Sequence, residues 1–116
     1  MIKASVRMYL ASNTRLASLD KTVDFMAMPR VGEFIKFNNK KMGSGFDFAI
    51  ADVIHVEDGN PEIMLELWSD EDRYNLFEDE NELDEYVESY EAEGWALRSM
   101  EENTLYRNEP DQGDHV

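Results

Sequence analysis

A chain of 116 residues with no cysteine and a formal net charge of −15 excludes several classes of protein. It can form no disulfide, no thiolate metal site and no thiol nucleophile. Its hydrophobic content of 42%, which includes six Phe, five Tyr and two Trp, is too high for a disordered acidic chain and sufficient for the core of one domain. The sequence also lacks the apolar run of a signal peptide or a membrane helix, so we expect a cytoplasmic protein with no membrane contact.

Charge is divided unevenly along the chain. Residues 1–50 contain eight Lys and Arg against four Asp and Glu, a net charge of +4. Residues 51–116 contain three Arg against 22 acids, a net charge of −19. A field of this sign repels nucleic acid and anionic membranes and attracts basic partners. A role in solubility alone is the simpler alternative.

The first 28 residues predict a β-hairpin. Apolar and polar side chains alternate strictly over residues 2–10, which is typical of a half-buried antiparallel strand. Residues 11–14 are turn formers, so a second strand is expected within residues 15–28. The length of this second segment predicts a bend or bulge near Asp20.

Three further strands are predicted before any helix. Pro29 fits a strand end and Gly32 permits a positive φ, after which a third strand begins at Phe34. After a polar loop, residues 46–57 predict a long strand that is apolar on both faces in its middle, and we expect it at the centre of the sheet. The turn DGNP and a fifth strand follow. This order favours an α+β fold built on a bent antiparallel sheet or small barrel of five or six strands.

One amphipathic helix is predicted at about residues 79–93, where carboxylates are dense and no Lys or Arg occurs. Asp79 is a good N-cap, and Glu82 three residues later completes a capping pattern. Gly94 is expected to end the helix and to place Trp95 against Tyr90. Four apolar residues at helical spacing form the stripe that packs on the sheet. The stripe consists of Leu83, Tyr86, Val87 and Tyr90.

The remaining residues complete one domain. Residues 95–107 predict a last strand or hairpin edge, and residues 108–116 predict a disordered tail. We find no internal repeat and no change of composition that marks a domain boundary. A single α+β domain over residues 1–107 is therefore expected.

Two motifs resemble a pattern of small bacterial and phage proteins of unknown function. In that pattern a P-x-x-G-[DE] turn leads into one strand, and a V-x-x-V-x-H strand and a hairpin follow. The matching residues are Pro29, Gly32 and Glu33, then Asp52, Val53, Ile54 and His55, with Ala49 and Ile50 at the first aliphatic position. The glycine–acid–strand element also recurs in SH3-like barrels. The resemblance covers about residues 1–68 and implies an SH3-like small barrel without a transferable activity.

No combination of residues predicts catalysis, a cofactor or a metal. His55 is the one histidine in the expected domain, and it has no Ser, Cys or second His at a diagnostic spacing. We interpret it as a half-buried, hydrogen-bonded structural residue; a small enzyme or ligand-binding barrel around it is the third functional hypothesis. Residues 69–75 begin like a calcium loop but lack its turn glycine and its final glutamate. A non-enzymatic protein is expected.

A basic segment gives the second functional hypothesis. Lys36, Lys40 and Lys41 lie near Phe34 and Phe37, a composition found on small barrels that bind single-stranded nucleic acid. A solvated loop is the simpler interpretation, because the acidic half of the chain opposes nucleic acid. Nucleic acid is therefore not the expected partner.

The acidic outer face of the predicted helix gives the leading hypothesis. Like charges four residues apart destabilise a helix by about 0.2–0.5 kcal/mol per pair, and a helix selected only for stability would carry lysine at several of these positions. We therefore expect the face to bind a basic protein partner, as nucleic-acid mimics, phage-encoded inhibitors and toxin-neutralising proteins do. Either a monomer or a homodimer is compatible with the sequence. The candidate partner-binding residues are Glu80, Asp84, Glu88 and Glu91.

Overall fold

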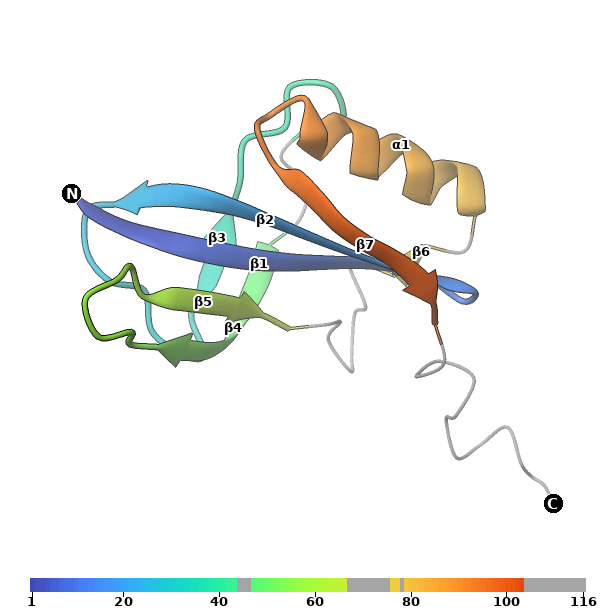
Figure 1. Cartoon of the computed structure of the whole chain (residues 1–116). Coiled ribbons are helices and arrows are strands. Elements are labelled where there is room, and N and C mark those ends of the chain that lie inside the picture. The colour runs from blue at the N-terminus through green and yellow to red at the C-terminus, as the bar shows by residue number, and fades with distance from the viewer. Residues whose placement is uncertain (44–46, 67–75, 78, 104–116) are drawn as a thin grey trace, which may run out of the picture.

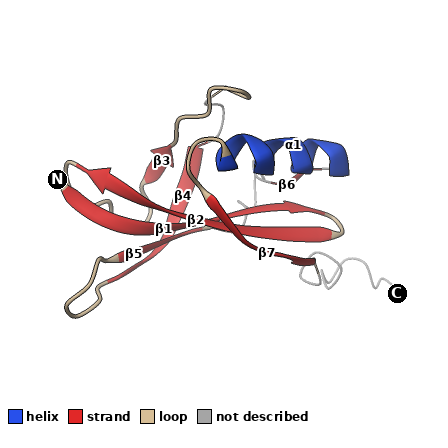
Figure 2. Ribbon diagram, turned by 45° about the horizontal axis from the view of Figure 1, so that its top comes forward, coloured by secondary structure: helices blue, strands red, loops and turns tan. Residues whose placement is uncertain are grey.

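The computed structural model describes residues 1–43, 47–66, 76–77 and 79–103. These residues form an α+β fold in which one helix packs on a mostly antiparallel open sheet (Figures 1 and 2). The predicted tail and the calcium-like segment 69–75 lie outside the described residues. In chain order the elements are β1 (Ile2–Ser12), β2 (Arg15–Phe25), β3 (Phe34–Lys36), β4 (Asp47–Ile54), β5 (Glu62–Leu65), β6 (Leu76–Phe77), α1 (Glu80–Glu91) and β7 (Ala96–Glu102).

The β1–β2 hairpin forms as predicted, with antiparallel pairing from Ile2↔Phe25 to Ala11↔Leu16. The alternation in β1 directs every second side chain into the core, because successive side chains of a strand point to opposite faces. The bend or bulge expected in the second strand near Asp20 is not in β2, which pairs with β1 without interruption. The pairing of β2 with β7 does shift its register between Ser18 and Leu19, but the extra residue is Arg98 of β7. The fully buried residues of this alternation are Ala4, Val6, Met8 and Leu10.

The order of strands decides between the two predicted architectures, an antiparallel sheet and a small barrel, and corrects the place of one strand. Six strands follow the path β3-β4-β5-β1-β2-β7, and β6 pairs with β1 beside that path. Strand β4 lies next to the β3 edge rather than at the centre. In its apolar middle Phe48 and Ile50 are buried in the core, and Ala49 and Ala51 are half-buried. Strand β1 runs parallel to β5 and to β6, so the sheet is not purely antiparallel. Within the described residues the edge strands β3 and β7 do not pair, so the sheet stays open instead of closing into a barrel.

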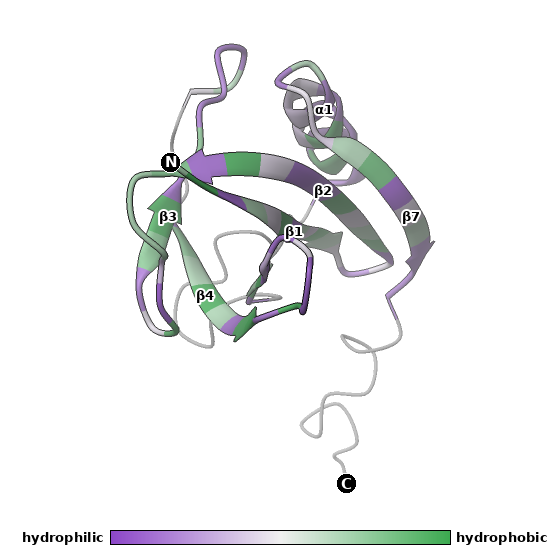
Figure 3. Cartoon of the chain, turned by 60° about the vertical axis from the view of Figure 1, so that its left-hand side comes forward, coloured by the Kyte–Doolittle hydropathy of each residue, from purple (hydrophilic) through white to green (hydrophobic). Residues whose placement is uncertain are grey.

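The sheet curls around the core, and α1 covers it on one side (Figures 2 and 3). Leu83, Val87 and Tyr90 of the predicted stripe are buried, and Tyr86 packs partly buried against the core and stacks on Phe77. Burial of each large apolar side chain contributes about 1.5–3 kcal/mol. The stripe therefore holds a helix whose outer charges repel one another.

Both ends of α1 agree with the sequence signals. The Asp79 carboxylate accepts a hydrogen bond from the Asn81 amide at 2.9 Å, as an N-cap does. At the other end the Trp95 amide donates to the Tyr90 carbonyl oxygen at 3.1 Å, and Gly94 has a φ of +100°. The expected contact between Tyr90 and Trp95 is confirmed, because their rings meet edge to face with centroids 6.2 Å apart.

Candidate functional site

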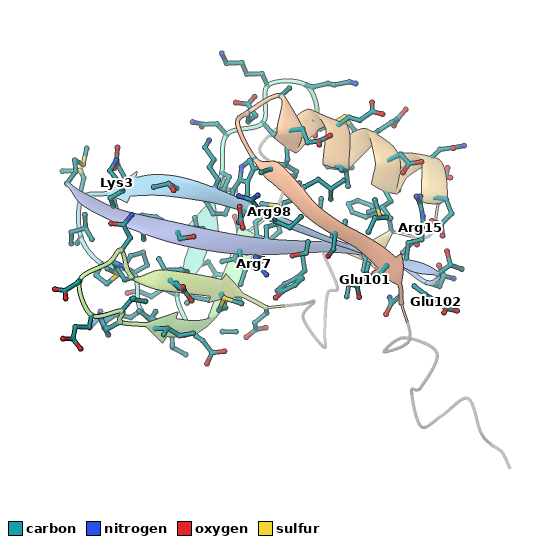
Figure 4. All side chains as sticks on the ribbon, in the orientation of Figure 1. Lys3, Arg7, Arg15, Arg98, Glu101 and Glu102 are labelled. Atoms are coloured by element: carbon teal, nitrogen blue, oxygen red, sulfur yellow. The ribbon has the colours of Figure 1, made fainter. Side chains whose placement is uncertain are left out.

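Arg15 fastens the first turns of α1 to the β1–β2 hairpin (Figure 4). Its Nε donates to Glu80 Oε1 at 2.8 Å, and its Nη2 donates to Asp84 Oδ1 at 3.0 Å and to the Glu80 carbonyl oxygen at 3.2 Å. Thr14 Oγ1 donates to the second oxygen of Glu80 at 2.6 Å. One guanidinium group thus holds two carboxylates that stand four residues apart on the helix.

The electrostatics of this cluster favour its ionised form. The bond to Glu80 is the largest contribution that raises the pKa of Arg15, and Asp84 adds to it against partial burial. For Glu80, burial is the largest single effect and opposes ionisation, but hydrogen bonds with Thr14, Ser12 and Arg15 outweigh it and lower the pKa. The carboxylate therefore stays charged at neutral pH.

The expectation of an unpaired acidic face is wrong for two of its four candidate residues. Glu80 and Asp84 are half-buried ion-pair partners of Arg15, whereas Glu88 and Glu91 are exposed. The repulsion expected between Glu80 and Asp84 is relieved by the shared guanidinium group. Because Arg15 and Glu80 are 65 positions apart in the sequence, no local sequence pattern predicts that they pair.

Four carboxylates of α1 remain exposed and without a cation in the described part of the chain. They recur every three residues, so each step advances about 4.5 Å along the helix and turns about 60° around it. Two of them were not among the sequence-based candidates, although the three-residue spacing could have identified them. We call this set the open acidic stripe, and it consists of Glu82, Glu85, Glu88 and Glu91.

No protein-family model, curated protein or solved structure matches this chain. The resemblance to small SH3-like proteins therefore stays a prediction. What the protein does has to be inferred from its own residues.

The C-terminal end of α1 carries no basic residue, but two neighbouring segments compensate for this. Lys21 Nζ of β2 donates to the Glu93 carbonyl oxygen at 2.7 Å, which places a cation at the negative end of the helix dipole. The Glu93 carboxylate accepts a bond from the Lys40 amide at 2.8 Å. A carboxylate at the negative end of the helix dipole is unfavourable, and for Glu93 these contacts with β2 and the loop after β3 offset that effect.

The loop after β3 is anchored to the helix by a buried polar contact. Asn39 Nδ2 donates to Ser89 Oγ at 2.7 Å, and Ser89 Oγ donates to the Tyr86 carbonyl oxygen at 2.7 Å. Asn39 Oδ1 accepts from the Met42 amide at 3.0 Å. Both ends of α1 are thus fixed to the sheet and its loops, so the open acidic stripe is held on a rigid element.

The basic segment is only partly available for a ligand. Lys36 pairs with Asp47 at 2.8 Å, whereas the exposed ammonium groups of Lys40 and Lys41 have no carboxylate partner among the described residues. Most other cations of the first half are also paired. On the solvent face of the sheet, Asp20 binds both Arg7 and Arg98 (Figure 4). Among the described residues the ion pairs involve six cations and six carboxylates, so pairing uses a larger share of the 11 Lys and Arg than of the 26 Asp and Glu.

His55 does not lie in a half-buried, hydrogen-bonded position, as the sequence suggested. It follows the last residue of β4 and is exposed. No group of His, Asp and Glu within the described ranges is arranged to hold a metal ion. No helix in that part of the chain is long and apolar enough to cross a membrane.

Proposed function

We propose that this protein is a non-enzymatic interaction module whose open acidic stripe binds a basic surface of a partner protein. The observation that carries the proposal is that Glu82, Glu85, Glu88 and Glu91 are exposed and have no cation partner among the residues the structure describes, on a helix fixed at both ends. A fixed helix loses little conformational entropy on binding, so its charges are already positioned for a partner.

The density of negative charge on the stripe supports binding to a surface that recognises nucleic acid. Its carboxylates advance about 4.5 Å per step along the helix, while one strand of B-DNA carries a phosphate about every 3.4 Å along its axis. The two arrays wind in opposite senses, so the likeness is one of charge density and not of superposable geometry. The proposed partner is therefore a nucleic-acid-handling protein, and the proposed activity is inhibition by occupation of its phosphate-binding surface.

Charge reversal tests this proposal. The tagged full-length chain is used to capture partners from cells that produce it, and Glu85→Lys/Glu88→Lys is compared with the wild type. Both side chains are exposed, so the fold should persist, while capture should fall at least about tenfold because each reversal replaces an attraction with a repulsion. The matched control is Glu57→Lys/Glu62→Lys, which makes the same change of net charge at two exposed residues of the β4–β5 hairpin.

The two variants separate a specific stripe from a general effect of charge. Loss of capture in the helix variant alone supports the stripe, and equal loss in both variants assigns binding to net charge. Undiminished capture by the helix variant contradicts the proposal. For a captured protein, an added DNA or RNA duplex should compete with the wild-type chain, and failure to compete would rule out mimicry.

A further inference from the structure

A groove runs along the free side of β3. It has a volume of about 660 Å³, which is within the range of about 300–1,000 Å³ typical of ligand sites. One wall is β3 itself, and the other is formed by Phe25 at the end of β2 and by residues 27–30 of the following loop. No residue of β4 lines the groove. Figure 3 shows the loop running beside β3 before the chain turns into that strand.

The backbone of β3 directs hydrogen-bonding groups into this groove. The Ile50 amide donates to the Glu33 carbonyl oxygen at 2.9 Å, and Ile35 is paired with Phe48, so residues 33 and 35 bond toward β4. Because these directions alternate in an antiparallel pair, the N–H and C=O groups of Phe34 and Lys36 point away from β4. No described strand pairs with that side of β3. An edge of this kind is a template for another strand.

Apolar side chains line the groove. Phe34 is 66% exposed within it, whereas Met26 and Val31, which are 89% and 62% exposed, belong to the adjoining loop and are not among the lining residues. Phe25, Met28 and Ile35 are partly buried beside them and pack against the core. Apolar surface concentrated beside a free strand edge indicates a binding site for a peptide chain.

The charge at the groove is opposite to that of the molecule. Two cations, Arg30 and Lys36, and one acid, Glu33, line the groove in a chain whose net charge is −15. Lys36 also pairs with Asp47 of β4, and these two side chains are 55% and 51% exposed. The Arg30–Glu33 pair is 3.3 Å long and Arg30 is 82% exposed, so its guanidinium group can turn toward another carboxylate at little cost. Since exposed charges are screened beyond about 8–10 Å, these local cations determine what binds.

We propose that the groove binds an extended, acidic and apolar segment of a partner protein, which adds as a strand to β3. The main chain of the segment bonds to Phe34 and Lys36, its apolar side chains cover Phe25 and Met28, and its carboxylates reach Arg30 and Lys36. This site is separate from the open acidic stripe and takes a ligand of opposite charge. It does not depend on the function proposed above.

Two synthetic peptides test the chemistry of the ligand. Acetyl-EVFVE-amide is titrated into the ¹⁵N-labelled full-length protein, and acetyl-KVFVK-amide is the matched control with the same apolar core. We expect saturable shifts at the amides of Met28, Phe34 and Lys36 with the acidic peptide below about 1 mM. The basic peptide should bind at least about fivefold more weakly, because two exposed pairs are lost. Equal affinity of the two peptides, or shifts confined to other parts of the protein, would overturn the proposal.

Two substitutions at one position test strand addition itself. Lys36→Gln removes the ammonium group alone, whereas Lys36→Pro also removes the N–H group that points into the groove, a change that edge strands tolerate. Lys36→Pro should weaken the acidic peptide about three- to tenfold relative to Lys36→Gln. Lys3→Gln is the matched control, because Lys3 is 58% exposed and pairs with Asp24, as Lys36 is 55% exposed and pairs with Asp47.

The outcomes are all decisive. Equal affinity of the Gln and Pro variants would exclude strand addition, and weakening by Lys3→Gln equal to that by Lys36→Gln would exclude local recognition. If the proline variant is unfolded, the affinity of the acidic peptide is measured instead for Phe34→Ser, a substitution at an exposed position of β3. Concentration-dependent broadening of the β3 amides without peptide, with dimers in sedimentation equilibrium, would show that a second copy covers the groove and would overturn the proposal.

Discussion

The Arg15 contact gives a quantitative prediction about stability. Replacement by alanine removes two ion pairs and the bond to the Glu80 carbonyl oxygen. The side chains of Arg15, Glu80 and Asp84 are 32%, 40% and 48% exposed, so each pair is screened by water and contributes about 0.2–1 kcal/mol. The carbonyl bond adds about 0.5–1.5 kcal/mol. Because the three contacts share one guanidinium group, their contributions are not fully additive, and we expect Arg15→Ala to lower the free energy of unfolding by about 1–2 kcal/mol at pH 7.

Thermal unfolding followed by circular dichroism measures this loss. For a chain of this size, about 1–2 kcal/mol corresponds to a fall of about 4–10 °C in Tm. Arg30→Ala is the control, because the Arg30–Glu33 pair lies in solvent and its loss should leave Tm unchanged. Equal shifts for the two variants would refute the reasoning.

The pH dependence of the same effect has a defined sign. The pKa of Glu80 in the folded protein lies below its ordinary value of 4.5, so its stabilising contribution is fully present above that pH. The contribution is lost as pH falls through the folded pKa. The Tm difference between wild type and Arg15→Ala should therefore narrow steadily below pH 4.5. A difference that is constant down to about pH 2 would show that charge does not hold the helix in place.

Three further predictions concern the helix and its surroundings. Asn39→Ala should cost about 1–3 kcal/mol in urea unfolding, because it removes the donor to buried Ser89; a loss below about 0.5 kcal/mol would contradict the buried contact. Gly94→Ala should cost about 1–2 kcal/mol through its φ of +100° and not through a clash, since an added Cβ meets only the Lys21 side chain at 3.5 Å. Gly94→Asn should recover part of that loss of stability. A Gly94→Ala variant with unchanged stability would contradict the role given to the positive φ of Gly94. Burial raises the pKa of Tyr90 to about 12, so the absorbance change of its phenol should appear near pH 12 in an alkaline titration and be absent in Tyr90→Phe. Because this phenol ionises at a lower pH in the unfolded chain than in the folded one, the free energy of unfolding should fall as pH rises above 10.

Local features of the sequence predicted the individual elements well. The period-two pattern identified β1 and its buried side chains, because burial of one face constrains every second residue. Asp79 and Gly94 marked the helix ends, because capping depends on residues within one turn. The α+β class followed from the order of these elements.

Contacts between distant segments were not predictable in the same way. The parallel neighbour of β1 is β5, and nothing in either strand encodes that choice. The pairing of Arg15 with Glu80 and Asp84 also joins segments that are distant in sequence, so no local pattern predicts it. This pairing changed which acids remain open for a partner. His55 was misplaced because a single histidine has no periodicity from which burial can be read.

The place of β1 in the sheet has a consequence for the order of folding. Its hairpin partner follows it after two residues, whereas β5, its neighbour on the other side, follows it after 49 residues. Closing the longer loop is entropically harder, so the inner edge of β1 should stay open after the hairpin has formed. In pulsed hydrogen exchange during refolding, the Ser5 amide, which donates to the Pro61 carbonyl oxygen at 2.9 Å, should become protected after the Val6 amide on the β2 side. Simultaneous protection would indicate that the hairpin does not form alone. Until β5 arrives, that open edge is the part of the chain most exposed to pairing with another molecule.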